Sequence, residues 1–220
     1  MQYLLSKLNV LKEYKKTLDF LCGLTIIDRE TLQNHKNTII CVIIDASYLE
    51  RGMKAMSYLQ HPFGPLYNEN SRVLILGSFP SVKSREQNFF YGHPQNRFWK
   101  VIAAVSGRPV PVSIDEKKQL ILSSGLALWD SIAGCEITGS SDASIRKARA
   151  NDIGLILDNC DIERIYCNGR KSHELYCKYI EPQTGRAAAC LPSTSPANAQ
   201  WTLDRLIEAW SVISDVTGRE

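Results

Sequence analysis

The sequence predicts an α/β protein in which helices cover both faces of a central, mainly parallel, four-stranded sheet in a three-layer α/β/α arrangement. Two observations support this prediction. Four short apolar segments end in glycine, proline or small polar residues, as buried strands do. Segments of helical periodicity lie between and after them, and strands that alternate with helices usually pair in parallel, covered on both faces.

Each expected strand is a short apolar run followed by a turn signal. These strands lie within residues 72–77 (RVLILG), 125–132 (GLALWDSI), 164–169 (RIYCNG) and 187–196 (AAACLPSTSP, where the strand enters a loop). Helices are expected over residues 97–105, 115–123, 151–160, 171–180 and 197–212. Residues 134–151 are rich in small polar and basic side chains, which predicts a long, structureless surface loop.

Composition limits the class of protein. The 220 residues are 44% hydrophobic, enough for one sizeable core, and the net charge of +3 permits nucleic acid as a partner without indicating it. The seven cysteines are odd in number and form no CxxC pair, which favours reduced thiols over a zinc or iron–sulfur site. No apolar run reaches the roughly 18 residues of a membrane span, so we expect a soluble, unexported protein.

The chain is expected to consist of an N-terminal extension, residues 1–57, and a functional domain, residues 58–220. The extension has leucines at near-helical spacing and an apolar run, IICVII, at residues 39–44. This composition fits either an added helix and strand or a loosely attached appendage. Met53 and Met56 are alternative starts, and we expect deletion of residues 1–52 to leave activity largely intact.

Three loops are expected to surround one cleft, because ligands of such sheets bind beyond the carboxyl ends of the strands. They are GSFPS (77–81), NGRKS (168–172) and LPSTSPAN (191–198). The backbone amides of GSFPS can hold an anion or a carbonyl oxygen, although an ordinary strand-to-helix turn has the same composition. The hydroxyls of LPSTSPAN can contact phosphate, or Ser195 can cap a helix whose start is marked by Pro196.

The segment NFFYGHPQNRFWKV (88–101) combines aromatic rings, amides and cations. Phe98 and Trp99 are expected to begin a helix and pack inward. Phe89, Phe90 and Tyr91 precede a glycine and a proline, which predicts a loop where a ring can stack on a nucleobase.

The polar side chains of this segment have several expected roles. Asn96 offers a donor and an acceptor, which suits reading a base edge or orienting a water, and the sequence leaves open which end of the amide it presents. His93 is either an acid–base group or a structural histidine. Arg97 and Lys100 are expected to meet phosphate.

HPQNRFWKVI closely resembles the segment that follows motif 1 in the mismatch-specific branch of the uracil-DNA glycosylase superfamily. The order of GSFPS, YGHPQNRFW, LALWDSI and LPSTSPAN is most similar to the DNA-deoxyinosine (hypoxanthine-DNA) glycosylases of that superfamily, over about residues 61–210. The resemblance implies an α/β/α domain that flips a deaminated base out of DNA and hydrolyses its N-glycosidic bond. It implies no metal or redox cofactor, and the matched motifs contain no lysine placed for a lyase step.

The resemblance also implies a set of site residues. Phe79 stands at the third position of motif 1, where uracil-excising relatives usually carry Asp, Asn or Glu to handle water, while the deoxyinosine branch relies on an asparagine at the position of Asn96. Tyr91 would stack on the flipped base. The expected roles are therefore catalytic for Asn96; base pocket for Gly77, Ser78, Phe79, Tyr91 and His93; and DNA contact for Ser193, Thr194, Ser195, Pro196, Asn198, Arg97 and Lys100.

No carboxylate is expected near the sugar. Stabilisation of the departing base would then account for more of the lowering of the activation barrier, through hydrogen bonds from Asn96, backbone amides and His93. Excision of uracil or xanthine is the nearest alternative. A second alternative is a damaged-DNA-binding protein that lost catalysis because Phe79 replaces the polar residue. A third alternative is a small-molecule hydrolase on a similar scaffold. The expected partner is DNA with deaminated bases, bound by a monomer in the prokaryotic cytoplasm or the eukaryotic nucleus, with no membrane contact.

Overall fold

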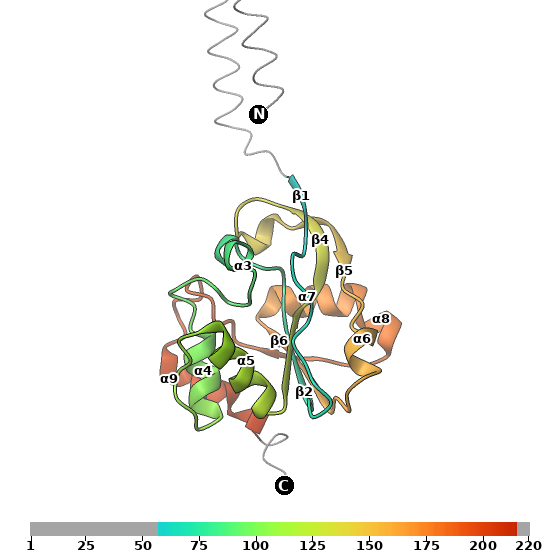
Figure 1. The fold of residues 1–220 in the computed structure, drawn as a ribbon. Coiled ribbons are helices and arrows are strands. Elements are labelled where there is room, and N and C mark those ends of the chain that lie inside the picture. Colours follow the sequence, from blue (N-terminus) through green and yellow to red (C-terminus); the bar gives the residue numbers. More distant parts are fainter. Residues whose placement is uncertain (1–56, 215–220) are drawn as a thin grey trace, which may run out of the picture. The chain divides into compact units, whose positions relative to one another are not determined.

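The computed structural model describes residues 57–214, and their core is a four-stranded sheet (Figure 1). Its strands are β2 (Val73–Gly77), β3 (Leu126–Asp130), β6 (Arg164–Asn168) and β7 (Ala189–Leu191). They lie in the order β3-β2-β6-β7, and each neighbouring pair is parallel. The predicted sheet is therefore confirmed. The predicted extension lies, except for Ser57, outside the described residues.

Helices cover both faces of this sheet, which confirms the three-layer prediction. In Figure 1, α4, α5 and α9 lie on one side of the parallel strands, and α6, α7 and α8 on the other. No helix within residues 57–214 is long and apolar enough to cross a membrane. The helices are α3 (Val82–Gln87), α4 (Phe98–Val105), α5 (Ile114–Ser123), α6 (Gly154–Leu157), α7 (Arg170–Tyr179), α8 (Glu181–Thr184) and α9 (Leu203–Trp210), with 3₁₀ turns η1 (Asp142–Ser144) and η2 (Ser211–Ile213).

Local chemistry explains the positions of several elements. All five residues of β2 are buried, as expected for a central strand covered on both faces. Helix α4 turns Phe98 and Trp99 into the core, as predicted. Helix α5 begins with a capping box, in which Ser113 accepts a hydrogen bond from the Glu116 amide and Glu116 reaches back to the cap.

The prediction of a structureless loop over residues 134–151 is wrong. β4 (Ile132–Ile137) pairs antiparallel with β1 (Ser57–Gln60) and with β5 (Arg146–Ala150), which forms a second, three-stranded sheet. The register between β4 and β5 shifts twice. Such irregularities break the two-residue alternation by which a half-buried strand is recognised in a sequence.

Two predicted helices differ from the structure. Within residues 151–160 only the single turn of α6 forms. The last helix, α9, begins at Leu203 instead of near Pro196, because Thr202 is its N-cap and accepts a hydrogen bond from the Arg205 amide. Helix α3 was not predicted from the sequence.

The expectation that Phe89 and Phe90 are exposed loop rings is wrong as well. Both lie between α3 and α4, yet they are only 7% and 3% exposed. Phe89 stacks on Trp99 with ring centroids 6.0 Å apart, and Phe90 meets Phe63 edge-on at 4.8 Å. These rings build the core beneath the site instead of standing free on a loop.

Candidate active site

A cavity of about 290 Å³ opens at the carboxyl end of the parallel sheet. This volume is at the lower limit of ligand pockets, which suits a small ligand such as a single nucleobase. The predicted meeting of the three loops is confirmed, because GSFPS, the first residue of NGRKS and much of LPSTSPAN border the cavity. Its lining residues are Gly77–Ser81, Ser84, Phe90, Tyr91, His93, Asn96, Asp130, Ser140, Asp142, Asn168 and Ser193–Ala197.

One wall of the cavity is a buried carboxylate at the end of β3. Asp130 accepts a hydrogen bond from Nε2 of His61 at 2.8 Å, and the two side chains are only 8% and 3% exposed. Nδ1 of His61 accepts from the Phe63 amide, so the neutral ring carries its proton on Nε2. Glycine at position 77 leaves room for this carboxylate, because a Cβ there would lie 2.1 Å from Oδ1 of Asp130.

Tyr91 lines the cavity, as expected, but its ring is already stacked inside the protein. It lies on Phe98 with ring centroids 3.7 Å apart, in a left-handed backbone conformation with φ of 49°. Its hydroxyl is buried without a hydrogen-bond partner in the described structure. Burial and the nearby Asp130 charge raise the pKa of Tyr91 well above its ordinary value, so this hydroxyl keeps its proton.

Asn96 lies at the cavity wall with its amide orientation determined by two neighbours. Its Oδ1 accepts from the Phe98 amide at 3.0 Å and from the Thr194 hydroxyl at 2.9 Å. A backbone N–H can only donate, so the atom it meets must be the carbonyl oxygen. Asn168 donates in turn to the Thr194 hydroxyl at 2.9 Å. The Asn96 NH₂ group is therefore left as the end available to a ligand.

His93 also borders the cavity. Its Nδ1 accepts a hydrogen bond from the Gln95 amide at 3.2 Å, which leaves Nε2 as the protonated nitrogen of the neutral ring. The backbone carbonyl of His93 accepts from the Asn96 amide at 2.9 Å. His93 thus supports the turn that carries Asn96, in addition to lining the cavity.

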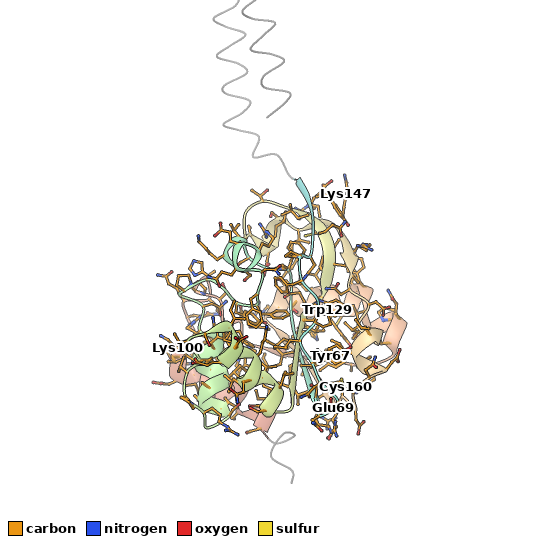
Figure 2. The ribbon with its side chains drawn as sticks, in the orientation of Figure 1. Tyr67, Glu69, Lys100, Trp129, Lys147 and Cys160 are labelled. Carbon is orange, nitrogen blue, oxygen red and sulfur yellow. The ribbon has the colours of Figure 1, made fainter. Side chains whose placement is uncertain are left out.

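Arg97 is not free to contact phosphate, contrary to the prediction from the sequence. Its guanidinium donates to backbone carbonyls of Ser195 at 2.6 Å and Asn198 at 3.1 Å, and also to those of Thr194 and Trp201. Most of its donors are thereby used, so Arg97 holds the LPSTSPAN loop against α4. Lys100 lies exposed on the outer surface of α4 (Figure 2) and does not line the cavity.

Hydrogen bonds within the LPSTSPAN loop stabilise its conformation. Ser193 accepts a hydrogen bond from the Ser195 amide at 3.2 Å, and the Asn198 side chain donates to the Ser193 carbonyl at 2.9 Å. Thr194 is fully buried, so the expected contact of its side chain with DNA is wrong. Pro196 is exposed, and Ser195 accepts from the Ala197 amide without capping a helix.

A second acidic side chain stands at the mouth of the cavity. Ser78 donates a hydrogen bond to Oδ1 of Asp142 at 2.8 Å, and two further contacts attach the 139–144 segment to the start of α3. Desolvation raises the pKa of the Asp142 carboxyl above its ordinary value, with the Asp130 charge acting in the same direction and the Ser78 hydrogen bond opposing both.

A wider groove of about 540 Å³ adjoins the cavity. It runs from Gly169 and the start of α7 to the turn before α9, and Arg170 and Lys171 contribute positive charge to it. Gly169 has a φ of 98°, and a Cβ there would lie 2.8 Å from Ser193. Glycine therefore allows the β6–α7 turn to approach the LPSTSPAN loop closely. No group of three or more potential metal ligands occurs within residues 57–214.

Fold and site together define the class of protein. A sequence model of the uracil DNA glycosylase superfamily matches residues 65–214, and the chain belongs to this superfamily. It is thus one of the enzymes that hydrolyse the bond between base and sugar in DNA.

Two proteins of known sequence and one solved structure are similar to this chain over most of their own length. A protein of Methanosarcina acetivorans named hypoxanthine DNA glycosylase is 31% identical over 160 residues, which are 70% of this chain and 98% of that relative. A protein of the same name from Methanosarcina barkeri is 28% identical over 138 residues, or 62% of this chain and 86% of that relative. The solution NMR structure of an M. acetivorans protein, described as a candidate uracil DNA glycosylase, superimposes with a TM-score of 0.63 at 28% identity and covers 73% of this chain and 99% of that one.

The structure adds site residues that sequence reasoning missed. Asp130 and His61 lie 69 positions apart, and Asp130 is the last residue of an apolar strand that was interpreted only as a buried strand. Its place at the carboxyl end of a parallel strand was an available signal. Asp142 lies in the segment expected to be a structureless loop, where no pattern indicated a contact with Ser78.

Proposed function

We propose that this chain removes hypoxanthine from deoxyinosine in DNA, with Asn96 as a catalytic residue. The observation that carries the proposal is the fixed amide of Asn96, which leaves an NH₂ donor facing a cavity of nucleobase size. Hypoxanthine presents a keto acceptor at the 6-position, where adenine presents an amino donor. A donor at this place stabilises the keto base and the negative charge that develops on it as it leaves.

Asp130 supports the same substrate class. Its Oδ2 is engaged by His61, and no hydrogen bond to Oδ1 is formed within residues 57–214. Deamination replaces an amino group and an unprotonated ring nitrogen by a carbonyl and a ring N–H. A pocket with a donor at Asn96 and an acceptor at Asp130 has the polarity that this edge requires, and adenine would leave both groups unpaired.

Uracil is a second candidate substrate, because it carries the same pairing of a ring N–H with a carbonyl. Phe79 distinguishes this chain from the uracil-excising branches that it resembles, because these usually carry Asp, Asn or Glu at this position. It packs at 6% exposure beside Ile132 and Leu175 and borders the cavity.

The flipped nucleotide would reach this pocket from the adjoining groove. Arg170 and Lys171 provide phosphate contacts there, and Pro196 stands exposed on the loop beside the lesion. We expect the protein to act as a monomer on cellular DNA, in the cytoplasm of a prokaryote or the nucleus of a eukaryote.

The test uses duplex oligonucleotides with a single deoxyinosine, deoxyuridine, deoxyxanthosine or undamaged base, and alkaline cleavage to reveal abasic sites. We expect cleavage at deoxyinosine to exceed the other reactions, and Asn96→Ala to lower the single-turnover rate about a hundredfold or more. Asn159→Ala is the matched control and should keep full activity, because Asn159 is exposed and its side chain donates to the Leu155 carbonyl, away from the cavity. Absence of deoxyinosine cleavage, or full activity of Asn96→Ala, would contradict the proposal.

A further inference from the structure

The two carboxylates of the pocket differ in what they border. Asp130 lines the base cavity alone, whereas Asp142 lines both the cavity and the adjoining groove. A nucleotide flipped into this site places its base in the cavity and its phosphates in the groove, so its sugar lies where the two meet. The residues that border both spaces are Asp142, Asn168, Ser193, Ser195 and Ala197, and Asp142 is the acidic one among them.

The position of Asp142 is determined by motif 1 itself. Ser78, the residue before Phe79, donates to Oδ1 of Asp142 at 2.8 Å. The described residues provide no hydrogen-bond partner for Oδ2. One carboxylate oxygen is thus held, and the other remains available at the junction.

We propose that Asp142 is a further catalytic residue, whose carboxylate lies against C1′ of the flipped nucleotide and replaces the polar side chain that motif 1 lacks at Phe79. This inference rests on the proposed glycosylase function. A carboxylate at this place offsets the positive charge of an oxocarbenium-like sugar and handles the attacking water, which no aromatic ring can do.

The reaction balances with water as the sole co-reactant. The bond between C1′ and N9 breaks, its electron pair leaves with hypoxanthine, and C1′ becomes electron-poor. The oxygen of water then bonds to C1′, and one water proton passes to the Asp142 carboxylate. The departing base anion finally takes up this proton through solvent, which regenerates the carboxylate.

A binding experiment with the full chain separates this role from a structural one. One duplex carries a cationic pyrrolidine at the lesion position, which mimics the charged sugar. The other duplex carries a neutral tetrahydrofuran at the same position. The wild-type protein should bind the cationic duplex at least about tenfold more tightly, as expected of a transition-state analogue. Asp142→Asn should abolish this preference while it binds the neutral duplex as the wild type does.

Kinetics provide the second measurement. Asp142→Asn should lower the single-turnover rate on the deoxyinosine duplex about a hundredfold. Asp161→Asn is the matched control, because it removes the same charge from an exposed residue just before β6, at the amino end of that strand, and should behave as the wild type.

The outcomes distinguish this inference from the proposed function. Deoxyinosine cleavage by the wild type, with an equal rate and an unchanged cation preference in Asp142→Asn, would overturn the role of Asp142 alone. A wild type that neither cleaves deoxyinosine nor prefers the cation would overturn both. Should Asp142→Asn not fold, Ser78→Ala keeps the carboxylate but removes its hydrogen bond, and an unchanged cation preference in that variant would refute the inference.

Discussion

At the scale of single residues, the amide of Asn96 illustrates how burial determines chemistry. An asparagine can present either a donor or an acceptor to a ligand, and these two orientations recognise different bases. The Phe98 amide and the Thr194 hydroxyl both donate to Oδ1 and select the orientation with NH₂ toward the cavity. Thr194 itself is oriented by Asn168 and fully buried. We therefore expect Thr194 to act through Asn96 as a positioning residue.

We expect Thr194→Val to lower the single-turnover rate on deoxyinosine about ten- to a hundredfold, because a loosened Asn96 samples unproductive orientations. Discrimination against adenine should fall with it. Thr194→Ser keeps the hydroxyl and should restore both properties. Thr184→Val removes a hydrogen-bonded hydroxyl from α8, away from the cavity, and should have no effect on rate. Equal rates for Thr194→Val and the wild type would refute this role.

At the scale of the elements, two adjacent parallel strands end at the same level of the sheet and place their last residues side by side in the site. Gly77 ends β2 and pairs in register with Asp130, which ends β3. This register brings the Asp130 carboxylate beneath the GSFPS turn, where it stays because position 77 has no side chain. His61 then holds the carboxylate from the segment after β1.

Gly77→Ala should displace the Asp130 carboxylate, since the added Cβ would lie 2.1 Å from Oδ1. A shift of about 1 Å at a binding group costs up to about a hundredfold in rate, so we expect a loss of that order on deoxyinosine. Gly64→Ala is the control, because a Cβ there meets no atom within 4 Å. Single-turnover rates of the two variants, compared with their melting temperatures, check the prediction. A Gly77→Ala enzyme as fast as Gly64→Ala would contradict it.

At the scale of the whole molecule, the glycosylase domain and the N-terminal extension are expected to be separable in function. The superfamily match begins at residue 65, and 98% of the M. acetivorans relative is matched by 70% of this chain. A relative matched so completely has no counterpart to a long extension. The catalytic groups proposed above all lie within the matched region, apart from the Asp130 partner His61.

We therefore expect a chain that starts at Met56 to cleave deoxyinosine at the rate of the full chain, since it keeps β1 and His61. A chain that starts at Gly64 is the contrasting variant, because it loses both and should be slower and less stable. Single-turnover kinetics and thermal unfolding of the two truncated proteins provide the measurement. A large loss of rate in the longer chain would show that the extension contributes to catalysis.

The sequence by itself determined the layered α/β/α fold, the four parallel strands and the convergence of three loops. These features depend on local apolar runs, on turn residues and on the rule that ligands bind at the carboxyl ends of parallel strands. It also identified Asn96, Phe79 and Tyr91 as cavity residues through their motifs, and all three line the cavity.

Only the tertiary structure decided which polar groups meet. The orientation of the Asn96 amide depends on Thr194, 98 positions away, and the contact of Asp142 with Ser78 spans 64. The burial of Phe89 and Phe90 and the use of Arg97 as a loop clamp depend equally on distant partners. Local patterns report propensity and periodicity, whereas hydrogen-bond pairing and desolvation depend on the neighbours that folding brings together.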